Sequence, residues 1–168
     1  KRGAKSIVRR EIVRTFTPAV KFDTEGRDAV FLGVVIPFQD RWTLVLLDAA
    51  TGECRYTEGL DATRLEQELG AKPIPHLLRI AGGVYPSLPV LPSQLVEELP
   101  ENYLGLSQAR KLLEAQYGVA RLDAFLPEAA SVHGLGILVH YTLRSLHRDR
   151  LEHLQPPRSL HAREQMAM

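Results

Sequence analysis

The stretch that decides the fold is SQARKLLEAQYGVARLDAFLPEAASVHGLGILVHYTLRSLH, residues 107–147. It is typical of two helices joined by a short connection that contains a proline. In the second helix, residues suited to burial recur at helical spacing and predict one buried face of about four turns. These residues are Val132, Leu135, Val139, Thr142, Leu143 and Leu146. We expect this helix to be the central element against which the upstream strands pack.

The first helix of the pair is predicted over residues 107–117, with Ser107 as its N-cap and Gly118 directly after its end. The apolar residues of this helix define an inward face, so that the polar residues between them turn toward solvent. The outward-facing polar residues that a partner could contact are Gln108, Lys111 and Glu114. A solvated helix surface with no partner would show the same pattern.

Upstream of this pair, three apolar segments at 29–38, 42–48 and 53–58 are separated by short turn sequences. The first is nearly continuous in apolar residues, as expected of a strand covered on both faces. The third alternates and places Cys54 and Tyr56 on one face. Strands joined by tight turns predict an antiparallel meander.

The segment after the meander predicts a helix that begins at Asp61 as N-cap and ends at Gly70, followed by a strand over 75–80. A helix between two strands favours a crossover that makes strand 75–80 parallel to the third strand. The segment 93–99 lies among prolines and is expected to form at most a helical turn. Near the start, residues 7–16 mix β-branched and charged residues, as an exposed edge strand would.

Composition limits the class of protein. The 168 residues, 45% of them hydrophobic, suffice for one globular domain, and a net charge of +1 provides no overall field toward nucleic acid or membrane. The single cysteine, Cys54, fits a reducing, cytoplasmic compartment. The apolar runs are too short to span a bilayer, so no membrane contact is expected. The chain begins at Lys1, from which we expect a piece excised from a longer protein.

Histidines recur every seven residues along the second helix, at His133, His140 and His147. A seven-residue step separates them by about 10 Å along the axis, which is too far for two of them to share one metal ion. A polar stripe that faces a neighbouring domain is the interpretation we favour. The sequence therefore predicts no metal site, and it contains no phosphate-binding or nucleophile motif that would predict a catalytic or cofactor site.

A meander followed by helix, strand and further helices predicts an α/β fold with a ribonuclease-H-like mixed sheet, in which parallel strands extend the antiparallel meander and helices pack on it. Nucleases of that fold hold two divalent ions with carboxylates, one of them inside the first long strand. Here that strand has no acid. A divalent-metal nuclease that uses Asp48, Glu53 or Asp61 remains the alternative hypothesis, although an aspartate after a strand more often stabilises its own turn.

Three segments in the same order resemble the connector region of the MutS family of DNA mismatch-repair ATPases. They read RREIVRTFTPAV at 9–20, LVLLDAATGECRYTE at 44–58 and ARKLLEAQYGVARLDAF at 109–125. The last segment is followed by an apolar helix and by LEHLQPP at 151–157, as in the family. The first segment departs from the family pattern, because Ala19-Val20 replaces Gly-Thr.

This resemblance implies a linker over 1–8, a connector domain of ribonuclease-H-like fold over 9–155, and an exit segment over 156–168 into the next domain. It implies a non-catalytic module that relays between mismatch-binding and ATPase domains and contacts a MutL-type partner, for which the exposed residues Gln108, Lys111 and Glu114 are the candidates. Mismatched DNA, ATP and magnesium would be bound by other parts of the longer protein. This segment itself would hold no cofactor, and the implied location is the cytoplasm, associated with the nucleoid.

Overall fold

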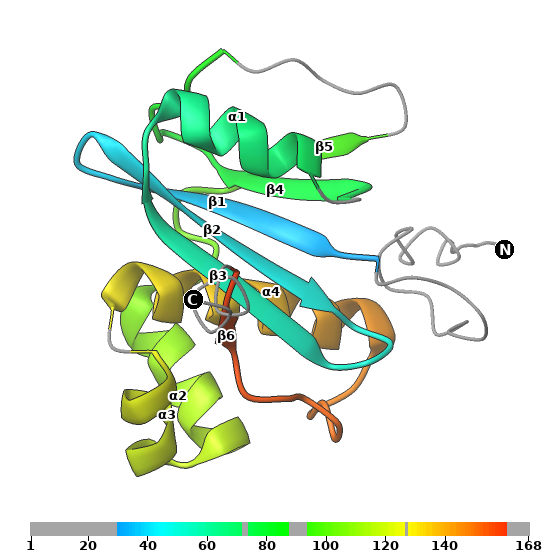
Figure 1. Ribbon diagram of the computed structural model, residues 1–168. Helices are drawn as coiled ribbons and strands as arrows, with labels where there is room; N and C mark the ends of the chain where they lie inside the picture. The colour runs from blue at the N-terminus through cyan, green and yellow to red at the C-terminus, as the bar shows by residue number, and fades with distance from the viewer. Residues whose placement is uncertain (1–29, 72–73, 88–93, 127, 161–168) are drawn as a thin grey trace, which may run out of the picture.

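The computed structural model describes residues 30–71, 74–87, 94–126 and 128–160. These residues form one mixed sheet with helices on both of its faces (Figure 1). The linker predicted over 1–8, the strand predicted over 7–16 and most of the segment predicted to leave the domain lie outside the described residues.

The sheet has six strands in the order β5-β4-β1-β2-β3-β6. The strands are β1 (Leu32–Phe38), β2 (Arg41–Asp48), β3 (Glu53–Leu60), β4 (His76–Ile80), β5 (Leu95–Leu99) and β6 (Arg158–Ser159). Strands β1, β2 and β3 form the predicted antiparallel meander, and β4, β5 and β6 are added in parallel pairings. The predicted fold class is confirmed: an α/β domain with a mixed sheet, an arrangement compatible with the ribonuclease-H-like fold.

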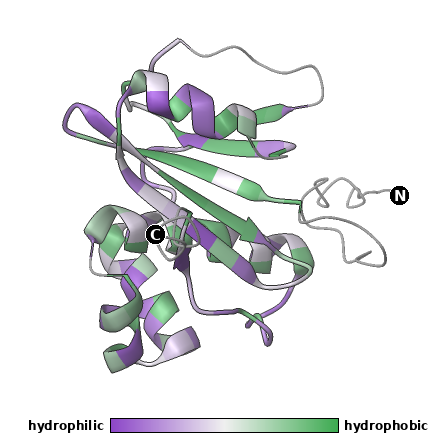
Figure 2. Cartoon of the chain, in the orientation of Figure 1, coloured by the Kyte–Doolittle hydropathy of each residue, from purple (hydrophilic) through white to green (hydrophobic). Residues whose placement is uncertain are grey.

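The strand β1 occupies the middle of the sheet, where it pairs with β2 on one side and β4 on the other. Figure 2 shows it coloured mainly as hydrophobic, in keeping with burial of both of its faces. The direction predicted for β4 is confirmed. Since β1 and β3 both run antiparallel to β2, a strand parallel to β1 is also parallel to β3, although β4 hydrogen-bonds to β1.

Residues 93–99 were expected to form at most a helical turn, and this prediction is wrong. Leu95–Leu99 is the strand β5, which pairs with β4 from His76 opposite Leu95 to Ile80 opposite Leu99. The local sequence contains two glutamates and lies among prolines, so its own propensity for a strand is weak. Pairing with a neighbouring buried strand supplies the backbone hydrogen bonds that this segment would otherwise lack.

The helix α1 (Ala62–Ala71) packs on one face of the sheet, where Leu65 and Leu69 join the apolar cluster as predicted. Asp61 is its N-cap, because its carboxylate accepts a hydrogen bond from the Arg64 amide at 2.8 Å. Gly70 does not end the helix as predicted, since the helix continues to Ala71.

The opposite face is covered by α4 (Ala129–Leu146), with α2 (Leu106–Tyr117) and α3 (Val119–Phe125) beyond it (Figure 1). The N-cap of α2 is Gly105 rather than the predicted Ser107, so the cap lies two residues earlier than predicted. The helix α4 is buried along most of its circumference between the sheet and α2, so the buried surface is wider than the single predicted face. It is therefore the central helix of the domain.

Two glycines permit this burial of α4. A Cβ atom at Gly134 would lie 2.7 Å from a methyl carbon of Val45 on β2, and one at Gly136 would lie 2.3 Å from the Cβ of Ala109 on α2. Both positions therefore bring α4 closer to its neighbours than any side chain would allow. The sequence pattern did not single out either glycine, because a glycine inside a helix has no apolar signal of its own.

After α4 the chain runs back to the sheet and pairs along the edge formed by β3. The backbone amide of Gln155 donates to the carbonyl of Gly52 at 2.9 Å, and that of Leu160 donates to the carbonyl of Tyr56 at 2.7 Å. Arg158 and Ser159 then pair with β3 as β6. Residues 156–160 are thus attached to this sheet, and the assignment of 156–168 to a following domain stays a prediction.

No single helix in the described part of the chain is long and apolar enough to cross a membrane. Helices α3 and α4 reach the required length and composition only together, and they are bent by 116° at the break between them.

The close contact of α4 with α2 predicts opposite effects for two glycine substitutions. Gly136→Ala should lower the free energy of unfolding by about 1–3 kcal/mol, because the added methyl overpacks the contact with Ala109. Gly70→Ala, with nothing within 4 Å of the added methyl, should raise it by up to about 1 kcal/mol through helix propensity. Urea unfolding of both variants measures the difference, and equal effects at the two sites would contradict the close packing.

Candidate functional site

The three residues predicted to contact a partner share the outer face of α2. Gln108 and Lys111 are exposed and Glu114 is partly exposed, while Ala109 and Leu113 on the other side of the helix are buried. Gln108 also has a structural role, because its side-chain oxygen accepts a hydrogen bond from the Gly105 amide at 2.9 Å and thereby caps the helix. Lys111 and Glu114 are therefore the better candidates for contact with a partner.

This face of α2 is held in place from three directions. The inner side packs on α4, and Arg110 pairs with Asp123 of α3 at 3.2 Å. Gln116 exchanges two hydrogen bonds with the backbone of Leu151, at 2.9 and 3.0 Å, and the Tyr117 hydroxyl donates to the carbonyl of Gln155 at 2.7 Å. The contacts of Gln116 and Tyr117 could not be predicted from the sequence, since they join α2 to a segment that lies more than thirty residues away. The outer face of α2 is thus a fixed surface.

The acids of the nuclease hypothesis each have a structural partner. Both carboxylate oxygens of Asp48 accept backbone hydrogen bonds, from Ala50 at 3.0 Å and from Val30 at 3.3 Å, as a turn aspartate does. Glu53 pairs with Arg55 at 2.6 Å, and Asp61 caps α1. The hypothesis gains no support from this arrangement, because these carboxylates stabilise turns and strand ends rather than converging on an open site.

The histidines of α4 do not form the predicted stripe toward a neighbouring domain. Nε2 of His133 lies 2.7 Å from the carbonyl of Leu104, and Nδ1 of His140 lies 3.1 Å from the Tyr103 hydroxyl. Both thus contact a loop of the same domain, and His147 ends the helix in a left-handed conformation with φ 55°. Within the described ranges, no three histidine, cysteine or acidic side chains gather as a metal site would require.

The cysteine is buried and lies beside a tyrosine, with 3.7 Å between the Cys54 sulfur and the Tyr117 hydroxyl. Burial raises the pKa of the Cys54 thiol to about 12. A thiol that stays protonated at neutral pH is a poor nucleophile. Cys54 therefore contributes to packing, as its apolar strand face indicates.

A polar cluster around the buried His76 joins β4, β5 and α4, and no sequence pattern predicted it. One carboxylate oxygen of Glu97 lies 2.9 Å from Nε2 of His76 and accepts a 2.7 Å hydrogen bond from the Tyr141 hydroxyl. The two rings also meet edge to face, with 5.5 Å between centroids. The three residues lie far apart in the sequence, and no local pattern distinguishes any of them. Only the pairing of β4 with β5 under α4 brings them together.

Burial shifts the pKa of two residues in this cluster, His76 and Tyr141. It lowers the pKa of His76, against the opposing effects of the hydrogen bond and the charge of Glu97. It raises the pKa of Tyr141, with the Glu97 hydrogen bond and charge adding to the effect. His76 is therefore neutral near pH 7 and donates from Nε2 to the carboxylate. A neutral donor beside a carboxylate suits a structural contact between two strands and a helix.

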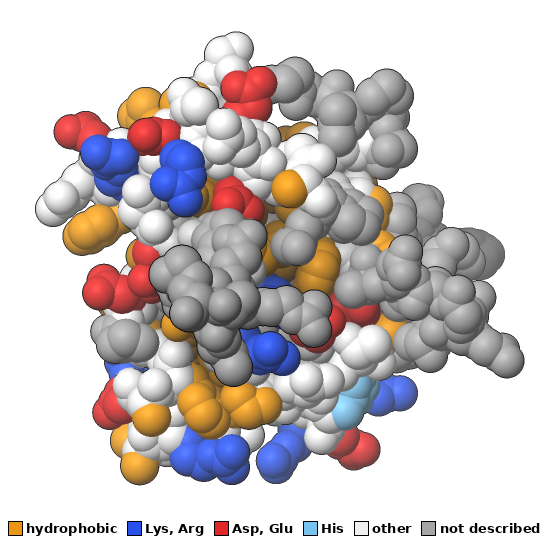
Figure 3. All heavy atoms as spheres, in the orientation of Figure 1, with side chains coloured by type: hydrophobic (Ala, Val, Ile, Leu, Met, Phe, Trp, Pro, Cys, Tyr) orange, Lys and Arg blue, Asp and Glu red, His pale blue; other side chains and the backbone are white. Residues whose placement is uncertain are grey.

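A cleft of about 550 Å³ borders this cluster and is mixed in charge, since its lining includes both Glu97 and Arg144. Its other lining residues are Leu99, Pro100, Tyr103, Tyr141, Ser145 and His147. Acidic and basic side chains are also interspersed on the face of the molecule that Figure 3 presents, with no single large basic area among the described residues there. A surface of this kind is typical of contacts between proteins or domains rather than of binding along a nucleic-acid backbone.

The chain is similar to one segment of several proteins named DNA mismatch repair protein MutS. It is 32% identical over 136 residues to the protein of Anaeromyxobacter sp., a match that covers 73% of this chain and 14% of the relative. It is 32% identical over 161 residues to that of Dinoroseobacter shibae, with 94% and 18% covered, and 32% identical over 173 residues to that of Thermosynechococcus vestitus, with 90% and 19% covered. No protein-family model matches. The chain thus spans less than a fifth of the length of these relatives.

The buried His76 predicts a loss of stability in acid. In the unfolded chain His76 regains its ordinary pKa of 6.5, whereas burial lowers the pKa in the folded protein. As the pH falls below 6.5, His76 is therefore protonated in the unfolded state before it is protonated in the folded state. The contribution of the neutral His76 to the free energy of unfolding, which is fully present above pH 6.5, is lost as the pH falls below this value. Urea unfolding at a series of pH values from about 7.5 to 5 should show a smaller acid-dependent loss for His76→Gln than for the unsubstituted chain.

The control is His147→Gln, which changes an exposed histidine at the end of α4. It should leave the acid-dependent loss unaltered. If His76→Gln lost stability with pH as steeply as the unsubstituted chain, the assignment of that loss to His76 would be wrong.

Proposed function

We propose that this chain is the connector module of a longer DNA mismatch repair protein. The premise is that the chain belongs to the MutS family of DNA mismatch repair proteins, in which it corresponds to one segment. In this role it relays between a mismatch-binding part and an ATPase part and offers a surface to a MutL-type partner. The observation that carries the proposal is the extent of the similarity, which includes nearly the whole chain but less than a fifth of each relative.

The arrangement of the fold supports a mechanical role. A relay between domains requires a body whose surface elements keep fixed positions with respect to one another. The helix α4 is buried between the sheet and α2, and Gln116 and Tyr117 tie α2 to the segment that follows α4. A force applied at the outer face of α2 is thus passed to the sheet and to the chain leaving it through packed side chains and short hydrogen bonds.

The outer face of α2 is the surface that we propose for the MutL-type partner. Lys111 and Glu114 lie one turn apart there and present opposite charges. Exposed charges of this kind set the orientation and rate of association more than the total affinity. Binding of mismatched DNA, ATP and magnesium is proposed for the remaining parts of the longer protein, in which this segment carries no active site of its own.

Exchange of the two charges on α2 tests the partner surface. In the full-length protein, Lys111→Glu combined with Glu114→Lys keeps the net charge but reverses the local pattern. It should weaken binding to the MutL-type partner roughly three- to tenfold, because attractive contacts become repulsive. Surface plasmon resonance with immobilised partner would measure the change.

A matched control is available on the opposite face of the sheet. Arg64→Glu combined with Glu66→Lys makes the same exchange on the exposed side of α1 and should leave partner binding unchanged. An undiminished affinity of the α2 variant, with its unfolding temperature preserved, would reject α2 as the partner surface.

The absence of a catalytic role is tested with the 168-residue chain itself. Incubated with ATP and magnesium, it should release no phosphate above background, and with magnesium or manganese it should leave labelled single- and double-stranded DNA intact. The full-length protein serves as the positive control for ATP hydrolysis. Cleavage of DNA that is abolished by Asp48→Asn would instead favour the nuclease hypothesis.

A further inference from the structure

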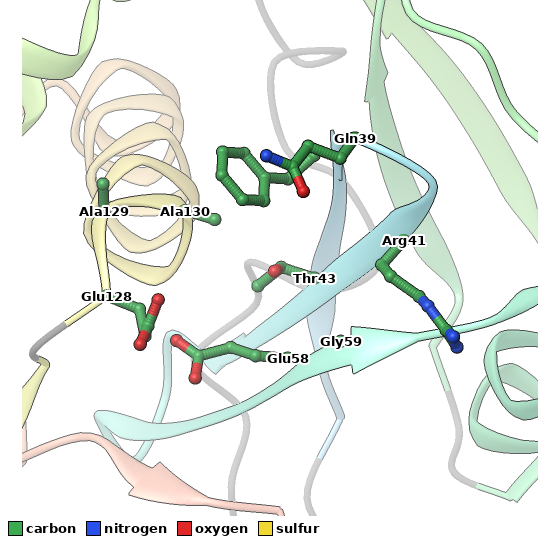
Figure 4. Close-up of a pocket in the computed structure, with 9 residues that line it drawn as sticks. Gln39, Arg41, Thr43, Glu58, Gly59, Glu128, Ala129 and Ala130 are labelled. Carbon is green, nitrogen blue, oxygen red and sulfur yellow. The ribbon is translucent and has the colours of Figure 1, made fainter.

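A cleft of about 400 Å³ lies where the β1–β2 turn meets β3 and the start of α4 (Figure 4). It shares no residue with the outer face of α2 and takes no part in the proposed contact with the MutL-type partner. Its lining residues come from three segments that are distant in sequence, 38–43, 58–59 and 128–130. The residues that matter for its chemistry are Phe38, Arg41, Glu58, Gly59, Glu128 and Ala130.

A β-bulge points Glu58 into this cleft. Leu44 of β2 pairs with Thr57 and Trp42 pairs with Leu60, so that Glu58 and Gly59 together oppose the single residue between Leu44 and Trp42. Gly59 adopts φ 68°, a conformation that favours glycine, and a Cβ atom there would meet nothing within 4 Å. A bulge redirects a side chain out of the alternation of its strand. The cleft beside Gly59 is open space.

The cleft holds two carboxylates that face each other. Glu58 accepts a hydrogen bond from the hydroxyl of buried Ser131, and in Figure 4 its carboxylate and that of Glu128 point toward one another. Partial burial raises the pKa of Glu58; the Ser131 hydrogen bond opposes this effect and the charge of Glu128 adds to it. A half-buried carboxylate next to a like charge gains most from a cation that arrives from outside.

The described part of the chain does not supply that cation. Arg41 lines the cleft, but its guanidinium points away from the two glutamates in Figure 4 and lies 3.7 Å from Asp61. Among the described residues, no lysine or arginine forms an ion pair with Glu58 or Glu128. The two carboxylates are thus left for a partner to neutralise.

One edge of the cleft is apolar. Phe38 stands at its edge with 60% of its surface exposed, beside Ala129 and Ala130 at the start of α4. The adjoining Gln39 holds φ 56°, which is uncommon for a residue other than glycine and maintains the turn that presents Phe38. An exposed aromatic ring beside two carboxylates is complementary to a peptide segment in which a cationic side chain stands next to an apolar one. Arginine fits best, because its planar guanidinium can bond to both carboxylates and stack on a ring.

We propose that this cleft docks a segment of a partner protein that presents an arginine beside an apolar side chain. The guanidinium lies between Glu58 and Glu128, and the apolar side chain covers Phe38. The occupant is a protein segment rather than a metal ion, because the described residues bring no third acidic or histidine ligand to these two carboxylates.

The test titrates the ¹⁵N-labelled 168-residue chain with the blocked peptide N-acetyl-Leu-Arg-Leu-amide and follows backbone amide resonances by NMR. The arginine peptide should give saturable shifts at Gln39, Gly59 and Ala130, and the peptide with glutamine in place of arginine should not. Glu58→Gln, whose amide oxygen can still accept from Ser131, should raise the dissociation constant at least about tenfold.

Two further variants separate this binding from changes in folding. Phe38→Ala removes a mainly exposed ring and should weaken binding without altering the spectrum elsewhere, whereas Glu66→Gln on α1 should bind the arginine peptide as the unsubstituted chain does. The proposal is overturned if the arginine peptide gives no saturable shifts or if Glu58→Gln binds it equally well. It is also overturned if magnesium alone or dilution of the chain shifts the same amides, which would indicate a metal ion or a second copy as the occupant.

Discussion

The contact on which the structure depends is the close packing of α4 between the sheet and α2. It rests on Gly134 and Gly136, where a side chain would overlap Val45 on one side and Ala109 on the other. Helices and strands pack by filling space to nearly crystalline density, so the spacing of these layers is set by their closest approach. The positions of α2, of the cleft at the start of α4 and of the buried His76 cluster all follow from this contact.

For function, the fixed packing means that the surface elements of the chain keep their positions relative to one another. The carboxylates that a nuclease would need are engaged in turns and caps, with Asp48 held by backbone amides and Asp61 at the start of α1. The buried His76 and the partly exposed Glu97 join two strands and a helix. The connector role that we propose for this segment of a longer mismatch repair protein requires such fixed positions.

The two proposed surfaces differ in how they would recognise a partner. The outer face of α2 presents the exposed Lys111 and the partly exposed Glu114, whose charges favour rapid, oriented association. The cleft between the β1–β2 turn and α4 is concave and places Glu58 against an apolar rim, which favours insertion of one side chain. A single domain can therefore take part in two contacts at once without either disturbing the central packing.

The sequence alone predicts the antiparallel meander, the capping of α1 by Asp61, the inward face of α2 and the family resemblance, because each depends on a local period or a local motif. Three other features emerge only when the chain is folded: residues 95–99 form a strand, His133 and His140 contact their own domain, and Glu58 points into a cleft. The physical reason is that these features depend on pairing and packing between segments far apart in the chain. Local propensity and charge carry no information about which distant segment lies opposite.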